Sequence, residues 1–344
     1  MGKHALSHNA AQVPSYDALL VLGFGGPEQP EDVIPFLENV LRGRNVPRQR
    51  LLAVAEHYYH FGGRSPINDQ CRALIAALEP KLDLPIYWGN RNWRPLLEDA
   101  MRRMAAGGVR RALVFVTSAY SSYSACRQYL DDIERARLAI GPGAPVCEKL
   151  RHFHDHPGFV GPNAEAVRAA RAKAPGAPVL FTAHSIPVEM ARTSKYVQQL
   201  EETARLVAAE AGVESYRLVY QSRGGPPQQP WLGPDILEAL SETKQAGAGA
   251  VVVSPIGFIS DHMEVMYDLD YEAARHCADI GLKMVRAGTA GGHPRFIEMI
   301  RELVEERRQG RAEADPCRQD CCPAPFRPAA AWIPAGGPAS PRTP

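Results

Sequence analysis

The 344-residue chain has no long hydrophobic segment. Its apolar runs stop well short of the roughly 20 residues that a membrane-spanning helix needs, and residues 1–16 lack the apolar core of a signal peptide. Net charge is also nearly absent. The 39 basic and 38 acidic residues leave a formal charge of +1, which gives no electrostatic reason to expect a nucleic-acid or anionic-membrane partner. We therefore expect a globular cytoplasmic protein without a transmembrane segment.

Several motifs of common catalytic sites are missing as well. The chain has no H-E-x-x-H or C-x-x-C pattern, which argues against a zinc protease or a zinc ribbon. The glycine turn at residues 23–27 lacks the full G-x-G-x-x-G pattern of a dinucleotide site. The serine of TAHSIP lacks the flanking glycines of a hydrolase nucleophile. Seven cysteines, an odd number, argue against a disulfide framework.

The chain does contain a regular alternation of short apolar segments with amphipathic ones. The apolar segments predict eight strands, at residues 17–24, 84–89, 111–119, 146–150, 179–184, 216–221, 250–256 and 282–287. Helices are expected between them, at residues 31–42, 48–61, 95–106, 119–132, 163–173, 195–211, 234–245, 263–277 and 293–308. Strands that alternate with helices form parallel sheets of right-handed βαβ units.

This pattern predicts an α/β fold with two similar Rossmann-like lobes and a cleft between them. Each lobe is a four-stranded parallel sheet flanked by helices, the first at residues 16–155 and the second at residues 156–308. A Pro- and Ala-rich tail that contains cysteines follows at residues 309–344.

Polar residues gather where the expected strands end, at residues 24–27, 90–93, 118–123, 184–185, 221–225 and 260–264. Ligands of open α/β sheets bind beyond the carboxyl ends of the strands, so we expect one active cleft there. His184 ends one strand and Glu264 follows another. An imidazole and a carboxylate together bind a divalent cation or pass protons near neutral pH, although a lone histidine is more often structural.

The segment at residues 251–272, VVVSPIGFISDHMEVMYDLDYE, changes from an apolar strand into an acidic helix. On that helix Asp261, Glu264, Asp268 and Glu272 fall three or four residues apart and would form one ridge. Like charges at this spacing destabilise a helix, so we expect a divalent cation to offset the repulsion. A solvated acidic face without a ligand is the alternative.

Aromatic residues are also frequent near the expected cleft, namely Phe24, Trp93, Tyr120, Tyr123, Tyr129 and Trp231. Such residues suit a large, flat, apolar ligand with a charged rim better than a small polar metabolite. Alternatively, they fill the cores of the lobes. The loop GGRSPIN, at residues 62–68, offers Arg64 and Ser65 for holding a carboxylate, or it is simply a helix-capping turn.

Seven motifs carry a family resemblance: LGFGGPE, FGGRSPIN, GNRNW, SAYSSYSACRQY, TAHSIP, QSRGGPPQQPWL and PIGFISDHMEVMYDLD. From about residue 16 to residue 308 the chain resembles the ferrochelatases, lyases that insert ferrous iron into a porphyrin in haem biosynthesis. The resemblance implies that His184 is the catalytic histidine and Glu264 the acidic residue opposite it, both also metal ligands. Asp268 and Glu272 would then extend a carboxylate relay towards solvent.

The motifs SYSACRQY and FGGRSPIN are most similar to the bacterial branch whose substrate is coproporphyrin III, which has four propionates. In that branch the residues matching Ser65 and Tyr129 contact the propionates, and we add Phe24, Arg64 and Tyr123 to the expected porphyrin-binding set. Several members place an axial tyrosine where this chain has Phe24, which cannot ligate iron.

Other functions remain open at this stage. One is a ferrochelatase that uses protoporphyrin IX and yields protohaem. Another is a related chelatase that inserts cobalt into a sirohydrochlorin-type ring. The last is a two-lobed protein that binds a tetrapyrrole or haem without turnover, which would give only stoichiometric binding where an enzyme gives catalytic metallation.

Some ferrochelatases carry a 2Fe-2S cluster held by one internal cysteine and three cysteines of a C-terminal extension. By resemblance, Cys126 matches the internal position, and Cys317, Cys321 and Cys322 would supply the others. Four thiolates are what such a cluster requires. Cys147 is an alternative ligand, and a tail with free thiols is the alternative interpretation. The expected cofactor is thus a 2Fe-2S cluster, with Fe²⁺ as the substrate metal.

Overall fold

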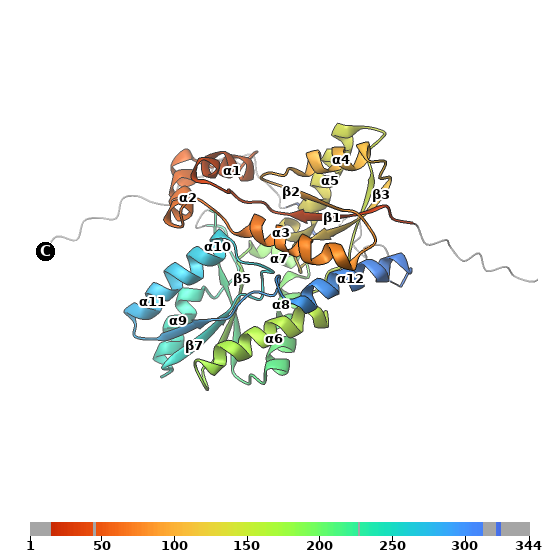
Figure 1. Ribbon diagram of the computed structural model, residues 1–344. Coiled ribbons are helices and arrows are strands. Elements are labelled where there is room, and N and C mark those ends of the chain that lie inside the picture. Colours follow the sequence, from red (N-terminus) through yellow and green to blue (C-terminus); the bar gives the residue numbers. More distant parts are fainter. Residues whose placement is uncertain (1–14, 44–45, 226–227, 312–320, 325–344) are drawn as a thin grey trace, which may run out of the picture.

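The computed structural model describes residues 15–43, 46–225, 228–311 and 321–324. In this part of the chain, two four-stranded parallel sheets form two lobes, as the sequence predicts (Figure 1). The strands of the first lobe are β1 (Ala18–Gly23), β2 (Ile86–Asn90), β3 (Arg111–Val116) and β4 (Val146–Lys149). Those of the second lobe are β5 (Val179–His184), β6 (Tyr216–Gln221), β7 (Ala250–Ser254) and β8 (Lys283–Arg286).

The two sheets have the same strand order. It is β2-β1-β3-β4 in the first lobe and β6-β5-β7-β8 in the second. All six residues of β1 are buried, which explains why this strand is a continuous apolar run without polar alternation. In the second sheet β5 lies between β6 and β7, so the carboxyl ends of these strands meet at one edge.

Helices cover both sheets. Those of the first lobe are α1 (Val33–Val40), α2 (Arg48–His60), α3 (Ile67–Leu78), α4 (Leu97–Ala106) and α5 (Gln128–Ile140), with the short 3-10 helices η1 (Pro30–Asp32) and η2 (Glu79–Lys81). Those of the second lobe are α6 (Pro157–Ala172), α7 (Val188–Arg192), α8 (Tyr196–Ala211), α9 (Ile236–Gln245), α10 (Met263–Val265), α11 (Ala274–Asp279) and α12 (Pro294–Arg308). Two segments are π-helices, η3 (Tyr123–Arg127) and η4 (Met266–Ala273). Across the described helices, none is both long and apolar enough to cross a bilayer.

The helix predictions differ from the structure in several places. The segment predicted as a helix at residues 119–132 begins as the π-helix η3 and continues into α5. Helices α3 and α7 were not predicted. Helix α6 begins at Pro157, ahead of the predicted start at residue 163, and contains Pro162. Pro162 lies in the second turn, where it removes the hydrogen bond to the carbonyl of residue 158, and the helix continues through it. The segment predicted as one helix at residues 263–277 is divided into α10, η4 and α11.

The two lobes share one hydrophobic core. Leu19 and Phe115 of the first lobe belong to the same buried cluster as Phe159 and Phe296 of the second. Helix α12 packs against α3 and α6, and Figure 1 shows α3 and α12 between the two sheets. The hydroxyl of Tyr120 also donates across the junction to the carbonyl oxygen of residue 256 at 2.7 Å. The predicted boundary at residues 155 and 156 falls just before α6 and stays a prediction, and most of the predicted tail lies outside the described residues.

Candidate active site

His184 and Glu264 lie in contact at the edge of the second sheet. His184 is the last residue of β5, and Glu264 lies in α10, which follows β7, the neighbour of β5. Nε2 of His184 is 3.7 Å from Oε2 of Glu264, and the two side chains are 34% and 52% exposed. The sequence predicts that the two groups lie opposite each other, but both belong to the second lobe and touch. A flat ligand would therefore meet them together, from one side.

The imidazole of His184 has a fixed orientation. Its Nδ1 donates to the carbonyl oxygen of Ser185, which can only accept, so Nε2 is the atom that faces Glu264. The backbone on either side is held by a hydrogen bond from the Tyr196 hydroxyl to the His184 carbonyl, at 2.9 Å, and by one from the Ser185 amide to the Gln221 carbonyl, at 2.7 Å. Neighbouring elements thus hold the ring so that Nε2 faces Glu264.

The two groups change each other's protonation. Burial lowers the pKa of His184, but the charge and hydrogen bond of Glu264 outweigh burial and leave the pKa above its ordinary value. Burial acts in the opposite direction on Glu264, yet the positive charge of His184 and, more weakly, of His262 and His57 holds the pKa of Glu264 well below its usual range. The pair therefore favours a proton on the imidazole and a negative charge on the carboxylate.

Asp268 is the next carboxylate along this helix. It lies in η4, where a π-helix replaces the predicted α-helix, and the wider turn keeps residues four apart close to one face. Asp268 accepts hydrogen bonds from the Gln221 amide, at 3.2 Å, and from the Ser222 hydroxyl. Ser222 has a φ of 60°, a left-handed conformation that is uncommon outside glycine. Burial raises the pKa of Asp268 to about 6, against the effect of the two hydrogen-bond donors.

The outermost predicted member of the relay is Glu272, which is exposed at the end of η4. Burial and then the charge of Asp235 raise the pKa of Glu272. Glu264, Asp268 and Glu272 follow one another at four-residue intervals along α10 and η4, and the relay stays a prediction.

Asp261, the fourth predicted member of the ridge, belongs to a different contact. Arg286, at the end of β8, binds its carboxylate with Nη1 at 2.9 Å and Nη2 at 3.0 Å and also contacts Asp270. An arginine of the chain itself thus offsets the charge of Asp261, and the divalent cation expected for the rest of the ridge stays a prediction. Within the described ranges, no three His, Cys, Asp or Glu side chains are arranged to hold a metal ion.

Helix α2 of the first lobe approaches the same segment. The ring of His57 stacks on that of Tyr267, with centroids 3.7 Å apart and planes 4° apart, and the ring of His60 lies 4.2 Å from that of Tyr271. Burial lowers the pKa of His57, while the charge of Glu264 opposes this effect. No role was predicted for these histidines, because nothing local in the sequence of α2 signals a contact with residues more than 200 positions later.

The predicted porphyrin-binding residues differ in accessibility. Phe24 is partly buried and packs edge-on against Phe36, with centroids 6.2 Å apart. Tyr123 is half-buried at the start of η3, and Arg64 is exposed and paired with Asp69 at 2.5 Å. Three of the five residues thus have surface that a ligand can reach.

The other two residues of that set are buried. Ser65 is 3% exposed and Tyr129 is 4% exposed, and the guanidinium of Arg91 lies 4.6 Å from the centre of the Tyr129 ring. Tyr120, at 1% exposure, is a core residue. The structure thus brings His184, Glu264 and Asp268 together, while the contacts of Ser65 and Tyr129 with a porphyrin stay predictions.

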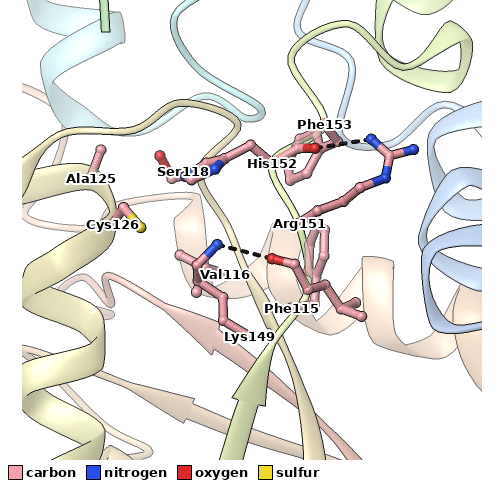
Figure 2. Close-up of a pocket in the computed structure, with 10 residues that line it drawn as sticks. Phe115, Val116, Ser118, Ala125, Cys126, Lys149, Arg151, His152 and Phe153 are labelled. Atoms are coloured by element: carbon pink, nitrogen blue, oxygen red, sulfur yellow. Dashed lines mark hydrogen bonds between the residues drawn. The ribbon is translucent and has the colours of Figure 1, made fainter. Parts of the chain in front are cut away.

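Cys126 lies apart from this site, in η3 of the first lobe, and is 2% exposed. It lines a cavity of about 10 Å³, enough for about one water molecule. Figure 2 shows Cys126 on the helix at one side of this cavity and Arg151 and His152 on the facing segment. Lys149, which is 6% exposed, also lines it and donates through Nζ to the carbonyl oxygen of residue 150 at 3.0 Å.

The other predicted cluster ligands lie near the C-terminus. Cys322 is 4% exposed and Cys321 is partly exposed, whereas Cys317 lies outside the described residues. Cys147, the alternative ligand, is a partly buried thiol on β4 whose pKa burial raises to about 12. The described part of the chain therefore leaves the predicted cluster untested.

Comparison with known proteins gives consistent matches. The family model "Ferrochelatase" matches residues 16–308. A protein named ferrochelatase from Rhodopirellula baltica is 52% identical over 91% of this chain and 95% of its own length. Proteins named coproporphyrin III ferrochelatase are 49% identical in Nocardia farcinica, over 92% of this chain and 99% of that protein, and 53% identical in Mycobacterium ulcerans, over 86% and 88%.

Solved structures show a similar fold. SirB from Bacillus subtilis with Fe³⁺ has a TM-score of 0.57 at 13% identity and covers 88% of this chain and 100% of its own. The sirohydrochlorin chelatase SirB from Bacillus subtilis subspecies spizizenii, in complex with cobalt, has a TM-score of 0.53 at 14% identity and covers 86% and 97%. At these identities the likeness concerns the fold alone.

Proposed function

The chain belongs to the ferrochelatase family, and on that premise we propose that it inserts Fe²⁺ into coproporphyrin III in haem biosynthesis. The observation that carries the proposal is the contact between His184 and Glu264, which joins a proton acceptor and a carboxylate at the edge of the second sheet. Relatives named coproporphyrin III ferrochelatase, 49% and 53% identical over most of the chain, support the choice of porphyrin.

Insertion replaces two pyrrole protons by one Fe²⁺, so the site must accept two protons for each turnover. Neutral His184 accepts a proton at Nε2, and the negative charge of Glu264 stabilises the imidazolium that results. Fe²⁺ approaches the same two side chains, which are a nitrogen and an oxygen ligand that suit this ion. Arrival of the cation favours loss of the proton from His184, which makes the pair ready for the next transfer.

We propose that the protons leave through Asp268 and Glu272. Glu264 binds a proton too weakly to hold it for long, whereas the pKa of Asp268, at about 6, lets this carboxyl group both take up and release a proton near neutral pH. Glu272 is exposed and would pass the proton to solvent. The order of these carboxylates along α10 and η4 supports the direction of the path.

For the porphyrin, we propose that Phe24, Arg64 and Tyr123 form the surface of the first lobe that faces the ring, with Ser65 and Tyr129 behind them. Arg64 would exchange Asp69 for a propionate, since a guanidinium binds any carboxylate in the same way. Phe24 offers an apolar contact and no ligating atom, so the product iron would receive no axial oxygen from this position.

We also propose a 2Fe-2S cluster held by Cys126, Cys317, Cys321 and Cys322. The burial of Cys126 and Cys322 supports this assignment, and buried Lys149 would offset part of the negative charge of four thiolates. When bound, such a cluster would accept one electron. We propose a cytoplasmic location as well, since Cys71, Cys147 and Cys277 are unpaired thiols of the kind that persist in a reducing compartment.

An anaerobic insertion assay with coproporphyrin III and protoporphyrin IX in parallel tests the proposed reaction. We expect many turnovers with Fe²⁺ and a kcat/KM at least about tenfold higher for coproporphyrin III. Protoporphyrin IX lacks two of the four propionates, so the polar groups of the site that bind them would be left without a partner. A preference for protoporphyrin IX would overturn the choice of substrate. Binding of one equivalent without metallated product would instead indicate a tetrapyrrole-binding protein.

A further inference from the structure

Arg286 ties together two carboxylates on either side of Glu264. Its Nη1 and Nη2 bind the two carboxylate oxygens of Asp261, at 2.9 and 3.0 Å, and its Nε lies 2.5 Å from Oδ1 of Asp270. Asp261 comes three residues before Glu264 and Asp270 six residues after it. The guanidinium, only 19% exposed, thus clamps both ends of the segment that carries Glu264 and Asp268.

A second contact reaches the same segment from the first lobe. The side-chain amide of Gln70 donates to the backbone carbonyl of Asp261 at 3.0 Å. Gln70 lies in the first turn of α3, and α3 begins at Ile67, just after the loop that contains Arg64 and Ser65. The loop that we assign to porphyrin binding is therefore continuous with a helix that holds the entry to α10.

We propose that Gln70, Asp261 and Arg286 form a positioning link, through which the porphyrin-binding loop of the first lobe fixes the orientation of Glu264 against His184. The inference rests on the proposed function and adds residues that touch neither iron nor porphyrin. The link acts through geometry, since a bidentate guanidinium holds a carboxylate in one orientation.

Without the guanidinium of Arg286, less positive charge would lie near the carboxylates of this short segment. Asp261, Glu264, Asp268 and Asp270 would then repel one another, and relaxation of the segment would move Glu264 away from His184. Small displacements of a positioning group have large effects, because a shift of about 1 Å can cost about 100-fold in rate. The kcat/KM for Fe²⁺ should therefore change more than the Kd for porphyrin, since the proposed porphyrin surface lies on the other lobe.

The test compares Arg286→Met, Arg286→Lys and Gln70→Ala with two matched controls. Arg217→Met removes an exposed arginine of the same sheet that pairs with Glu242, and Gln198→Ala removes an exposed glutamine of α8. For each variant we would measure kcat, KM for Fe²⁺, porphyrin Kd by fluorescence quenching, and the melting temperature.

We expect Arg286→Met to lower kcat/KM for Fe²⁺ by about 10- to 100-fold, the usual effect of losing a residue that orients a metal ligand. Porphyrin Kd should stay close to that of the wild type. Arg286→Lys keeps the positive charge but loses the bidentate contact of the guanidinium. Its activity should lie between those of Arg286→Met and the wild type. Gln70→Ala should cost about two- to tenfold, the effect of one hydrogen bond, and should add little to Arg286→Met because both act through Asp261.

Three results would overturn the link. The first is a wild-type kcat/KM for Fe²⁺ in folded Arg286→Met. The second is an equal loss of kcat/KM in both control variants. The third is a lower melting temperature of Arg286→Met with unchanged kcat/KM. If Arg286→Met does not fold, Asp270→Asn removes one of the two clamped carboxylates and is measured in the same way. A wild-type protein that metallates no porphyrin would refute the proposed function, whereas an active wild type with unaffected variants would refute only the link.

Discussion

Nε2 of His184, at the end of β5, and Oε2 of Glu264, in α10 beyond the neighbouring strand β7, lie 3.7 Å apart. Because of this contact, the histidine holds its proton more firmly and the glutamate holds its proton less firmly than in water. In the proposed reaction an incoming Fe²⁺ would take the place of the proton on His184. The pair would thus exchange protons for a cation, as metal insertion into a porphyrin requires.

Asp268→Asn should stabilise the protein at neutral pH. The native pKa of Asp268 is about 6, above its ordinary value of 3.8. A raised carboxyl pKa favours the native state only while the group is protonated, so this stabilisation is lost as the pH rises from about 4 to about 6. Above pH 6 the variant should exceed the wild type by up to about 3 kcal/mol in the free energy of unfolding. Urea unfolding at pH 7.5 checks this, and a less stable variant would contradict the raised pKa.

The same substitution should change the pH dependence of insertion. In the wild type, kcat should fall as the pH decreases through about 6, because Asp268 becomes protonated and no longer accepts a proton. Asp268→Asn should be slower at every pH and should lack this limb of the profile. An unchanged limb in the variant would assign it to another group and remove Asp268 from the relay.

Cys126→Ser should remove the proposed iron–sulfur cluster. The wild type, purified anaerobically, should contain about two iron atoms and two sulfides per chain and show the visible absorption of an oxidised 2Fe-2S centre. Serine at position 126 should abolish both signals. Cys277→Ser is the matched control, since Cys277 is also buried but lies in α11 of the second lobe. An iron-free wild type, or a cluster that survives Cys126→Ser, would contradict the assignment.

Glu148 joins the two lobes, and its loss should destabilise the chain. It accepts a hydrogen bond from the Tyr16 hydroxyl at 2.8 Å and pairs with Arg111 of β3 and with Arg307 of α12, at 2.5 Å from the latter. Glu148→Gln removes the carboxylate that both arginines contact and should cost about 3 kcal/mol in the free energy of unfolding. Glu242→Gln, which breaks only the exposed pair with Arg217, should cost less than about 1 kcal/mol. Equal effects in denaturant unfolding would refute the special role of Glu148.

The sheets could be predicted because each strand carries its own signal. The predicted bounds at residues 179–184 and 216–221 match β5 and β6 residue for residue, since apolar runs end there in polar residues. That His184 and Glu264 lie at the same edge of the second sheet was foreseeable too, because both follow strands of that lobe. Their direct contact was not, since the sequence predicts that they lie opposite each other. Helix α3 was not predicted, because the glycines and the proline just before it are typical of a loop.

The parts that could not be predicted depend on contacts between distant segments. Asp261 has the spacing of the acidic ridge, and only the fold brings it to Arg286. The segment of the π-helix η4 was predicted as part of one α-helix, since its sequence shows no change of pattern there. The burial of Ser65 and Tyr129 likewise follows from the helices around them, which a motif does not record.

The most direct test of the account is Fe²⁺ insertion by His184→Ala, measured anaerobically beside porphyrin binding by fluorescence quenching. Without Nε2 the site loses its first proton acceptor, so kcat should fall by at least about 100-fold. Coproporphyrin III should still bind with nearly the affinity of the wild type, because its proposed contacts lie on the first lobe. Insertion at the wild-type rate, or loss of porphyrin binding together with insertion, would contradict the role of the His184–Glu264 pair.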